Sequence, residues 1–102
     1  MRNKLSSYCG YEVELSRNSY VNNGRLAVSL ICLPEHEPFG TISVNINYPL
    51  SGDEKSLTFV DTNNYPGIER WLQENEIARP TGYYGRSGYC TYPEYRFDLE
   101  KL

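Results

Sequence analysis

Histidine, cysteine and long apolar runs are scarce in this 102-residue chain. It has one histidine and three cysteines, and a small odd number of cysteines is typical of a reducing compartment rather than of a disulfide framework. No apolar stretch approaches the roughly 20 residues that cross a membrane, and no apolar segment follows the charged first residues. We therefore expect a cytoplasmic protein with no membrane association.

Net charge is small, but it is unevenly distributed along the chain. The formal charge is −3, and residues 1–34 sum to +2, residues 35–78 to −6 and residues 79–102 to +1. A general nucleic-acid binder needs clustered lysine and arginine, so this profile disfavours that class. The acidic middle instead favours a surface that meets a basic partner.

Length and composition indicate a single globular domain over residues 1–102. A chain of this size buries roughly two-thirds of its unfolded surface without metals or disulfides. With 39% hydrophobic and 23% charged residues it is too apolar for a disordered chain. Tyrosine is unusually frequent, with ten residues, and its apolar ring with a polar tip suits a thin sheet or a contact surface.

Hydrophobic periodicity predicts a mostly β domain. Five segments have the alternation, the apolar run or the β-rich composition of strands: residues 8–16, 25–32, 42–48, 56–61 and 89–99. We expect the first two strands to pair as a hairpin, with the second nearer the sheet centre. Two prolines in residues 34–38 predict a turn that ends the second strand.

One short helix interrupts this pattern. Ile68, Trp71 and Leu72 share one helical face, which predicts a helix of about nine residues from Pro66 that must dock on the sheet to be stable. Asn75 is a candidate left-handed stop. The predicted fold class is α+β, an antiparallel sheet of about five strands with one short helix packed on it.

The usual catalytic and metal-binding patterns are missing. His36 lacks the spacing of a metal ligand and is better explained as part of a solvated turn. The three cysteines, Cys9, Cys32 and Cys90, all fall in predicted strands, where cysteine usually behaves as an inert hydrophobe. We expect no cofactor, no metal and no enzymatic activity. A hydrolase using Cys90 or His36 is kept as the last-ranked hypothesis, because the partners of a nucleophilic pair meet in space and need not be close in sequence.

Residues 83–92 gather four tyrosines, one arginine and two glycines. Gly82, Gly85 and Gly88 recur every third residue, but neither a lysine nor a helix follows them, so they predict positive-φ turns in a long loop rather than a phosphate site. Tyrosine and arginine in such a loop are typical of adaptable binding surfaces. The alternative, that the tyrosines cover the core, is the stronger one for any single ring, whereas Arg86 has little structural purpose at a loop tip.

Four runs of sequence are distinctive: FVDTNN (59–64), WLQEN (71–75), ARPTG (78–82) and SGYCTYPEYRFD (87–98). In these runs the chain resembles an uncharacterised family of small proteins from plasmids, phages and integrative elements of Gram-positive gut bacteria. Family members often carry a glycine after the helix-ending asparagine, where this chain has Glu76. The resemblance implies no catalytic residue. It implies the company of small proteins that disable host defence, anti-CRISPR proteins among them, which is an argument by association.

The leading hypothesis is a non-enzymatic protein that binds a protein or ribonucleoprotein partner, for example an anti-CRISPR-like inhibitor of a CRISPR effector. An acidic, tyrosine-rich surface would dock on the partner. The predicted partner-binding residues are Glu35, Glu37, Asp53, Glu54, Tyr83, Tyr84, Arg86 and Tyr89. The alternative is a single-strand nucleic-acid binder that stacks bases on tyrosines beside Arg79, Arg86 and Arg96.

Overall fold

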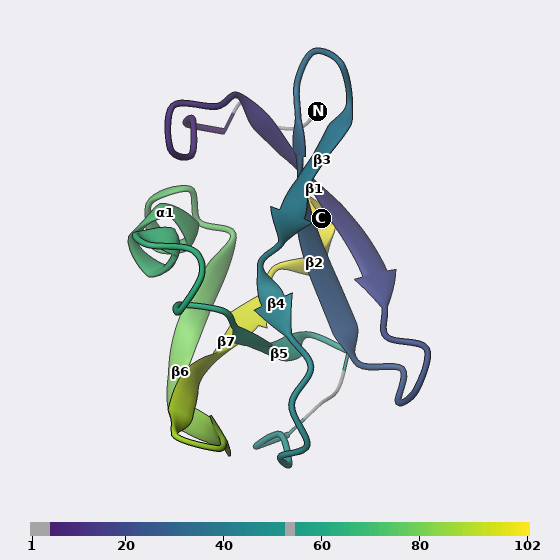
Figure 1. Cartoon of the computed structure of the whole chain (residues 1–102), viewed down its shortest axis with the longest axis vertical. Helices are drawn as coiled ribbons and strands as arrows, with labels where there is room; N and C mark the ends of the chain where they lie inside the picture. The colour runs from purple at the N-terminus through teal and green to yellow at the C-terminus, as the bar shows by residue number, and fades with distance from the viewer. Residues whose placement is uncertain (1–4, 53–54) are drawn as a thin grey trace.

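The structure of the chain is a computed structural model and describes residues 5–52 and 55–102. Within these residues the strands form two antiparallel sheets, ordered β1-β2-β3 and β4-β5-β7-β6, and helix α1 lies beside β6 (Figure 1). The elements in chain order are β1 (Val13–Ser19), β2 (Leu26–Cys32), β3 (Glu37–Thr41), β4 (Ser43–Val44), β5 (Leu57–Val60), α1 (Ile68–Glu74), β6 (Ala78–Ser87), β7 (Cys90–Phe97) and the 3₁₀ helix η1 (Leu99–Lys101).

The α+β class is confirmed, but the single sheet of about five strands is not. The division falls at Ile42, between β3 and β4. The Ile42 N–H donates to Val28 O in the first sheet at 2.9 Å, and its carbonyl accepts from Asp61 N beside the second sheet at 2.8 Å. One residue therefore links both sheets, and the chain changes sheet there.

The predicted strand over residues 42–48 is shortened to β4 for a physical reason that alternation does not reveal. The Asn45 side chain forms hydrogen bonds with Asn22 and Asn23 in the β1–β2 turn, at 2.9 and 3.0 Å. Arg25 Nη1 donates to Ile46 O at 3.1 Å. These polar contacts, rather than a strand ladder, hold the chain beyond Val44.

The first sheet pairs as predicted, with β2 in the centre. β1 and β2 pair over their whole lengths, from Val13↔Cys32 to Ser19↔Leu26. The predicted turn over residues 34–38 is displaced, because the turn occupies residues 33–36 and β3 includes Pro38. An edge strand tolerates a proline, since the missing N–H can face solvent.

The predicted first strand, residues 8–16, begins too early. Tyr8 and Tyr11 form an isolated bridge around a two-residue turn in which Cys9 has φ 49° and Gly10 φ 81°. Cys9 is therefore exposed in a turn and not buried in a strand. Tyr8 is buried instead: its ring contacts Trp71, and its hydroxyl donates to Pro66 O at 2.8 Å.

The helix is shorter than predicted because Gly67, in the left-handed region at φ 76°, precedes its first residue, Ile68. Its docking residues are confirmed: Trp71 is 5% exposed and Leu72 is fully buried. Trp71 Nε1 also donates to Ser6 O at 2.9 Å. The helix therefore holds the N-terminal segment as well as the sheet.

The left-handed residue that ends the helix is Glu76, one residue after the predicted Asn75. Asn75 has φ −88°, whereas Glu76 has φ 55° and takes the left-handed position. Glu76 N donates to Gln73 O at 3.1 Å and Ile77 N donates to Leu72 O at 2.9 Å. This double pattern is a Schellman motif, which normally places glycine where this chain has Glu76.

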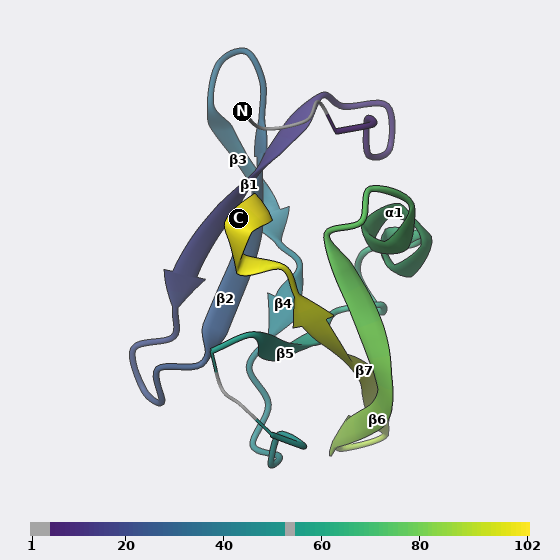
Figure 2. The same cartoon turned by 180° about the vertical axis from the view of Figure 1, so that it is seen from behind.

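Residues 79–88, predicted as a long loop, are mostly strand. β6 runs for ten residues and pairs with β7, which confirms the predicted last strand (Figure 2). The pairing shifts between Pro80 and Tyr84, where Gly82 adopts φ 88°. Glycine in a strand often marks such a bulge, so Gly82 bends β6 without ending it.

One hydrophobic core joins the two sheets and the helix. It includes Leu30 from β2, Val60 from β5, Leu72 from α1 and Tyr95 from β7, none of them exposed to solvent. Burying each of the three aliphatic side chains contributes about 1.5–3 kcal/mol. The sheets therefore stabilise one another across this core.

Candidate interaction surface

The β6–β7 hairpin carries the aromatic residues singled out in the sequence. Its ladder beyond the bulge runs from Tyr84↔Pro93 to Ser87↔Cys90, and Gly88 (φ 61°) and Tyr89 form the turn. Because side chains alternate across a strand, neighbouring residues of β6 serve opposite faces. The hairpin therefore separates a structural face from an open face.

Tyr83 and Gly85 belong to the structural face. The Tyr83 ring stacks on Phe59 with centroids 6.4 Å apart and also contacts Tyr48, and its hydroxyl donates to Pro49 O at 3.1 Å. Gly85 is buried, and a Cβ there would lie 2.6 Å from the Phe59 ring. Tyr83 was predicted as a partner-binding residue, and these contacts give it a packing role.

Tyr84 and Arg86 lie on the open face, and Tyr89 stands at the turn that follows; we call these three residues the hairpin surface. Tyr84 is 58% exposed, and Tyr89 at the turn is fully exposed. Arg86 is exposed and forms no hydrogen bond or ion pair with the residues that the structure describes. Two phenol rings and an unpaired guanidinium are therefore presented together to solvent.

The predicted acidic residues do not join the hairpin surface. Glu35 and Glu37 lie at the β2–β3 turn, and the hairpin turn lies at the other end of the longest axis, which measures 36 Å (Figure 1). Both carboxylates are exposed and form no ion pair within residues 5–52 and 55–102. Asp53 and Glu54 lie outside the described residues.

Other acidic residues of the middle segment are used within the fold. Glu69 accepts a hydrogen bond from the Tyr95 hydroxyl at 2.7 Å, and Glu74 accepts from Arg70 Nε at 2.8 Å. Asp61 accepts from the backbone and side chain of Asn64. Much of the negative charge counted in the sequence is therefore engaged in local structure.

The three arginines of the alternative hypothesis are separated by the sheet. Arg79 and Arg96 lie directly opposite each other on β6 and β7, whereas Arg86 pairs with Thr91. Thr91 and Arg96 are five positions apart on β7 and therefore face opposite sides. Arg86 consequently lies on the other face from Arg79 and Arg96, and the three do not form one track for a phosphate backbone.

The residues of the hydrolase hypothesis are also apart. His36 lies at the β2–β3 turn with Nδ1 3.4 Å from Glu14 Oε1, whereas Cys90 begins β7 beside the hairpin turn. The Cys90 sulfur accepts a hydrogen bond from Asn63 Nδ2 at 3.7 Å. Among the described residues no group of three or more His, Cys, Asp or Glu is arranged to hold a metal ion.

Buried Glu94 is the main residue that reasoning from the sequence missed. Its carboxylate accepts hydrogen bonds from Ser51 N at 2.8 Å, Ser51 Oγ and Thr81 Oγ1 at 2.8 Å. These contacts tie the segment after β4 to the bulge of β6. The only signal was its place in the SGYCTYPEYRFD run, whose function the sequence does not reveal.

Tyr95 is a second residue of that run with a structural role. It is fully buried, and burial, followed by its hydrogen bond to Glu69, raises the pKa of its hydroxyl above the ordinary value of 10.0. Burial likewise raises the pKa of Tyr8. Both phenols stay protonated at neutral pH and act as structural donors rather than as acids.

A comparison with protein families now places the chain. Residues 13–102 match the family described as a domain of unknown function, DUF4313, and the chain belongs to this family. The match covers both sheets, so it extends well beyond the C-terminal runs noted in the sequence. No curated protein and no solved structure matches the chain significantly. No helix within the described ranges is long and apolar enough to cross a membrane.

Proposed function

We propose that this protein is a non-enzymatic binding protein whose hairpin surface docks on a protein partner. The observation that carries the proposal is the contrast between neighbouring tyrosines. Tyr83 is fixed by ring contacts and a hydrogen bond, and Tyr95 by burial and hydrogen bonds, whereas Tyr84 and Tyr89 lie open beside an unpaired Arg86. Tyrosine and arginine dominate the energetics of protein interfaces, since both bring large contact area with polar tips.

The unpaired guanidinium indicates an acidic group on the partner surface. Buried in a contact, Arg86 needs a carboxylate or carbonyl to replace its water. The β-hairpin holds the three side chains on a rigid element, so little conformational entropy is lost when they bind. A flat acidic patch with a shallow apolar centre fits this arrangement.

Paired variants test the proposal. Tagged wild-type protein is used to capture partners from a lysate, and the captured protein is then titrated with purified variants. We expect the double variant Tyr84→Ser, Tyr89→Ser to weaken association by about 30-fold or more, as the loss of interface hot spots does. Tyr11→Ser is the matched control, because Tyr11 is 55% exposed but lies outside the hairpin. Equal binding by the double variant and wild type would refute the hairpin as the docking surface.

A narrower form of the proposal is an anti-CRISPR-like inhibitor of a nucleic-acid-handling complex. It is supported by the exposed carboxylates of Glu35 and Glu37, which can compete for a basic groove, and by the family resemblance noted in the sequence. A cleavage assay with a purified CRISPR effector tests it. We expect inhibition that is lost in Glu35→Lys, Glu37→Lys and that weakens with salt. An absence of inhibition refutes only this narrower form.

Single-strand nucleic-acid binding receives less support, because Arg86 lies on the other face from Arg79 and Arg96. A filter-binding assay at low salt separates the two functions. The docking proposal predicts no retained oligonucleotide, whereas stacking of bases on tyrosine predicts retention that Tyr84→Ser reduces.

A further inference from the structure

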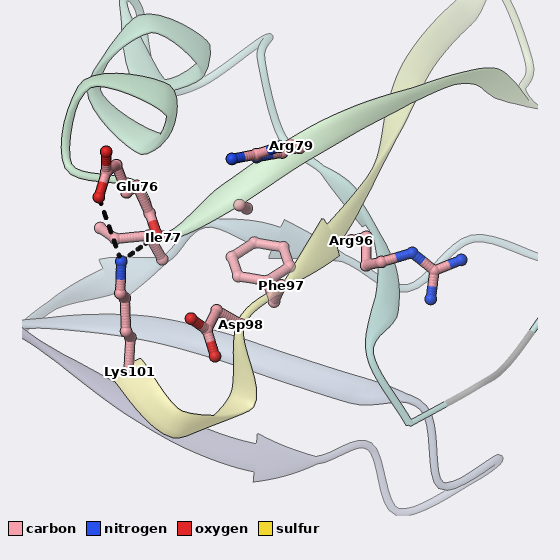
Figure 3. A pocket seen from close by; sticks show the side chains of 8 residues that line it. Glu76, Ile77, Arg79, Arg96, Phe97, Asp98 and Lys101 are labelled. Atoms are coloured by element: carbon pink, nitrogen blue, oxygen red, sulfur yellow. Dashed lines mark hydrogen bonds and ion pairs between the residues drawn. The ribbon is translucent and has the colours of Figure 1, made fainter.

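A second feature, independent of the hairpin surface, lies at the opposite end of the β6–β7 ladder. A hollow of ≈ 350 Å³ opens there between the end of α1, the β6–β7 pair and η1 (Figure 3). Its charged lining consists of Arg79, Arg96, Lys101, Glu76 and Asp98. The volume lies in the range of small-molecule sites, roughly 300–1,000 Å³.

Two of these cations, Arg79 and Arg96, lie where their like charges repel each other. Arg79 and Arg96 are directly opposite each other on antiparallel strands, and like charges in that position destabilise a sheet. Neither forms an ion pair with a described acidic residue, and Arg96 only donates to Ser56 Oγ at 3.2 Å. Their guanidinium groups point away from each other in Figure 3, as repulsion favours.

The third cation is already engaged. Lys101 Nζ donates to Glu76 O at 2.6 Å and lies 3.8 Å from Glu76 Oε2. This contact joins η1 to the end of α1 and fixes one wall of the hollow. The arginines are therefore the two lining cations whose charge is not neutralised within the described structure.

We propose that the hollow binds a small organic oxyanion, a phosphate or carboxylate group that bridges Arg79 and Arg96. Both arginine side chains are exposed, so the guanidiniums can turn from the positions drawn in Figure 3 toward one anion. Such an anion replaces their repulsion with two charge-assisted contacts, and arginine forks match the geometry of both oxyanions. Asp98 and Glu76 add negative charge to the lining, which disfavours polyanions and favours one anionic group on a small body. This site is distinct from the hairpin surface, since Arg79 and Arg96 face away from Arg86.

Calorimetric titration with phenyl phosphate and with benzoate tests the proposal, at constant ionic strength. We expect saturable binding of at least one ligand, weakened about tenfold or more in Arg79→Gln and in Arg96→Gln, as expected for a charged hydrogen bond. Arg86→Gln removes the same charge from the other face and should bind like wild type. The tighter of the two ligands identifies the oxyanion. Binding of neither, or equal weakening by Arg86→Gln, overturns the proposal.

Stability of the free protein supplies an independent readout. If the opposed arginines repel each other, Arg79→Gln should unfold at the same or a higher urea concentration than wild type without ligand. The same variant should gain less stability when phenyl phosphate is added. A variant that is less stable without ligand would show that the arginines serve the fold, and would overturn the site.

Discussion

The Tyr95 hydroxyl in β7 donates a 2.7 Å hydrogen bond to Glu69 Oε1 in α1 and accepts one from Gln73 Nε2 at 3.1 Å. A single buried phenol thus fixes two positions of a seven-residue helix on the second sheet. A helix of this length is not stable alone, so its position depends on such contacts and on the burial of Trp71 and Leu72.

Alkaline pH should unfold the protein partly through its buried phenols. Burial raises the pKa of Tyr95 in the folded state, and the unfolded chain ionises near the ordinary value of 10.0. This contribution to stability is complete below pH 10 and is lost as pH rises above it. We expect Tyr95→Phe to lose stability less steeply, by about 1 kcal/mol between pH 10 and 11, because the unfolded tyrosine is only half ionised at pH 10. Urea unfolding followed by Trp71 fluorescence measures both slopes, and equal slopes would contradict the expectation.

Removal of the buried carboxylate of Glu94 should be strongly destabilising. Glu94→Ala leaves the Ser51 N–H and the Thr81 hydroxyl without their acceptor and opens a cavity, which should cost about 3 kcal/mol or more in the free energy of unfolding. Glu94→Gln keeps the shape and one acceptor, so it should cost less. Chemical denaturation compares the pair. A glutamine variant as unstable as the alanine variant would show that charge, rather than hydrogen bonding and packing, decides the effect.

Glycine at position 76 should stabilise the helix end. Glu76 has φ 55°, and glycine adopts this conformation without the steric cost of a Cβ, so Glu76→Gly should raise stability by about 0.5–1 kcal/mol. The ion pair with Lys101 is exposed at Glu76 and contributes little. Glu76→Ala removes the same carboxylate but keeps the Cβ, so it should not be stabilising. Thermal unfolding of the two variants tests the difference, and equal midpoints would exclude backbone strain as the cause.

Gly85 should not tolerate a side chain, although its backbone is an ordinary strand. An alanine Cβ would lie 2.6 Å from Phe59 ring atoms and 2.8 Å from Ile46 Cδ1. Overpacking of this kind costs about 1–3 kcal/mol. Ser87→Ala is the matched control, because Ser87 is an exposed residue of the same strand. Equal urea midpoints for Gly85→Ala and Ser87→Ala would show that Phe59 and Ile46 yield at no cost.

The sequence pattern predicted correctly those elements that depend only on the side chains of their own segment. The apolar run that became β2 and the stripe of Ile68, Trp71 and Leu72 located a strand and a helix correctly. Residues 42–48 alternate as clearly, but the contacts of Asn45 with the β1–β2 turn override the pattern. Those contacts join residues far apart in sequence, and periodicity within a segment carries no information about them.

The candidate site was predictable in composition but not in arrangement. Tyr84, Arg86 and Tyr89 stand open to solvent, where a binding role requires them. The packing of Tyr83 on Phe59 and the position of Arg79 opposite Arg96 follow from the bulge at Gly82 and from strand register. The distance of Glu35 from the hairpin follows from the division into two sheets. A bulge changes which face each later residue serves, so an error of one residue reassigns the whole surface.

The central position of β7 has a consequence for how the protein is made. β5 has only the two-residue β4 on one side, and its other partner is β7, at residues 90–97. The amino end of a chain leaves the ribosome first, so β5 emerges before β7, the strand that completes its sheet. Until Phe97 has left the exit tunnel, the nascent chain presents the open edge of β5, where a strand of another chain could pair.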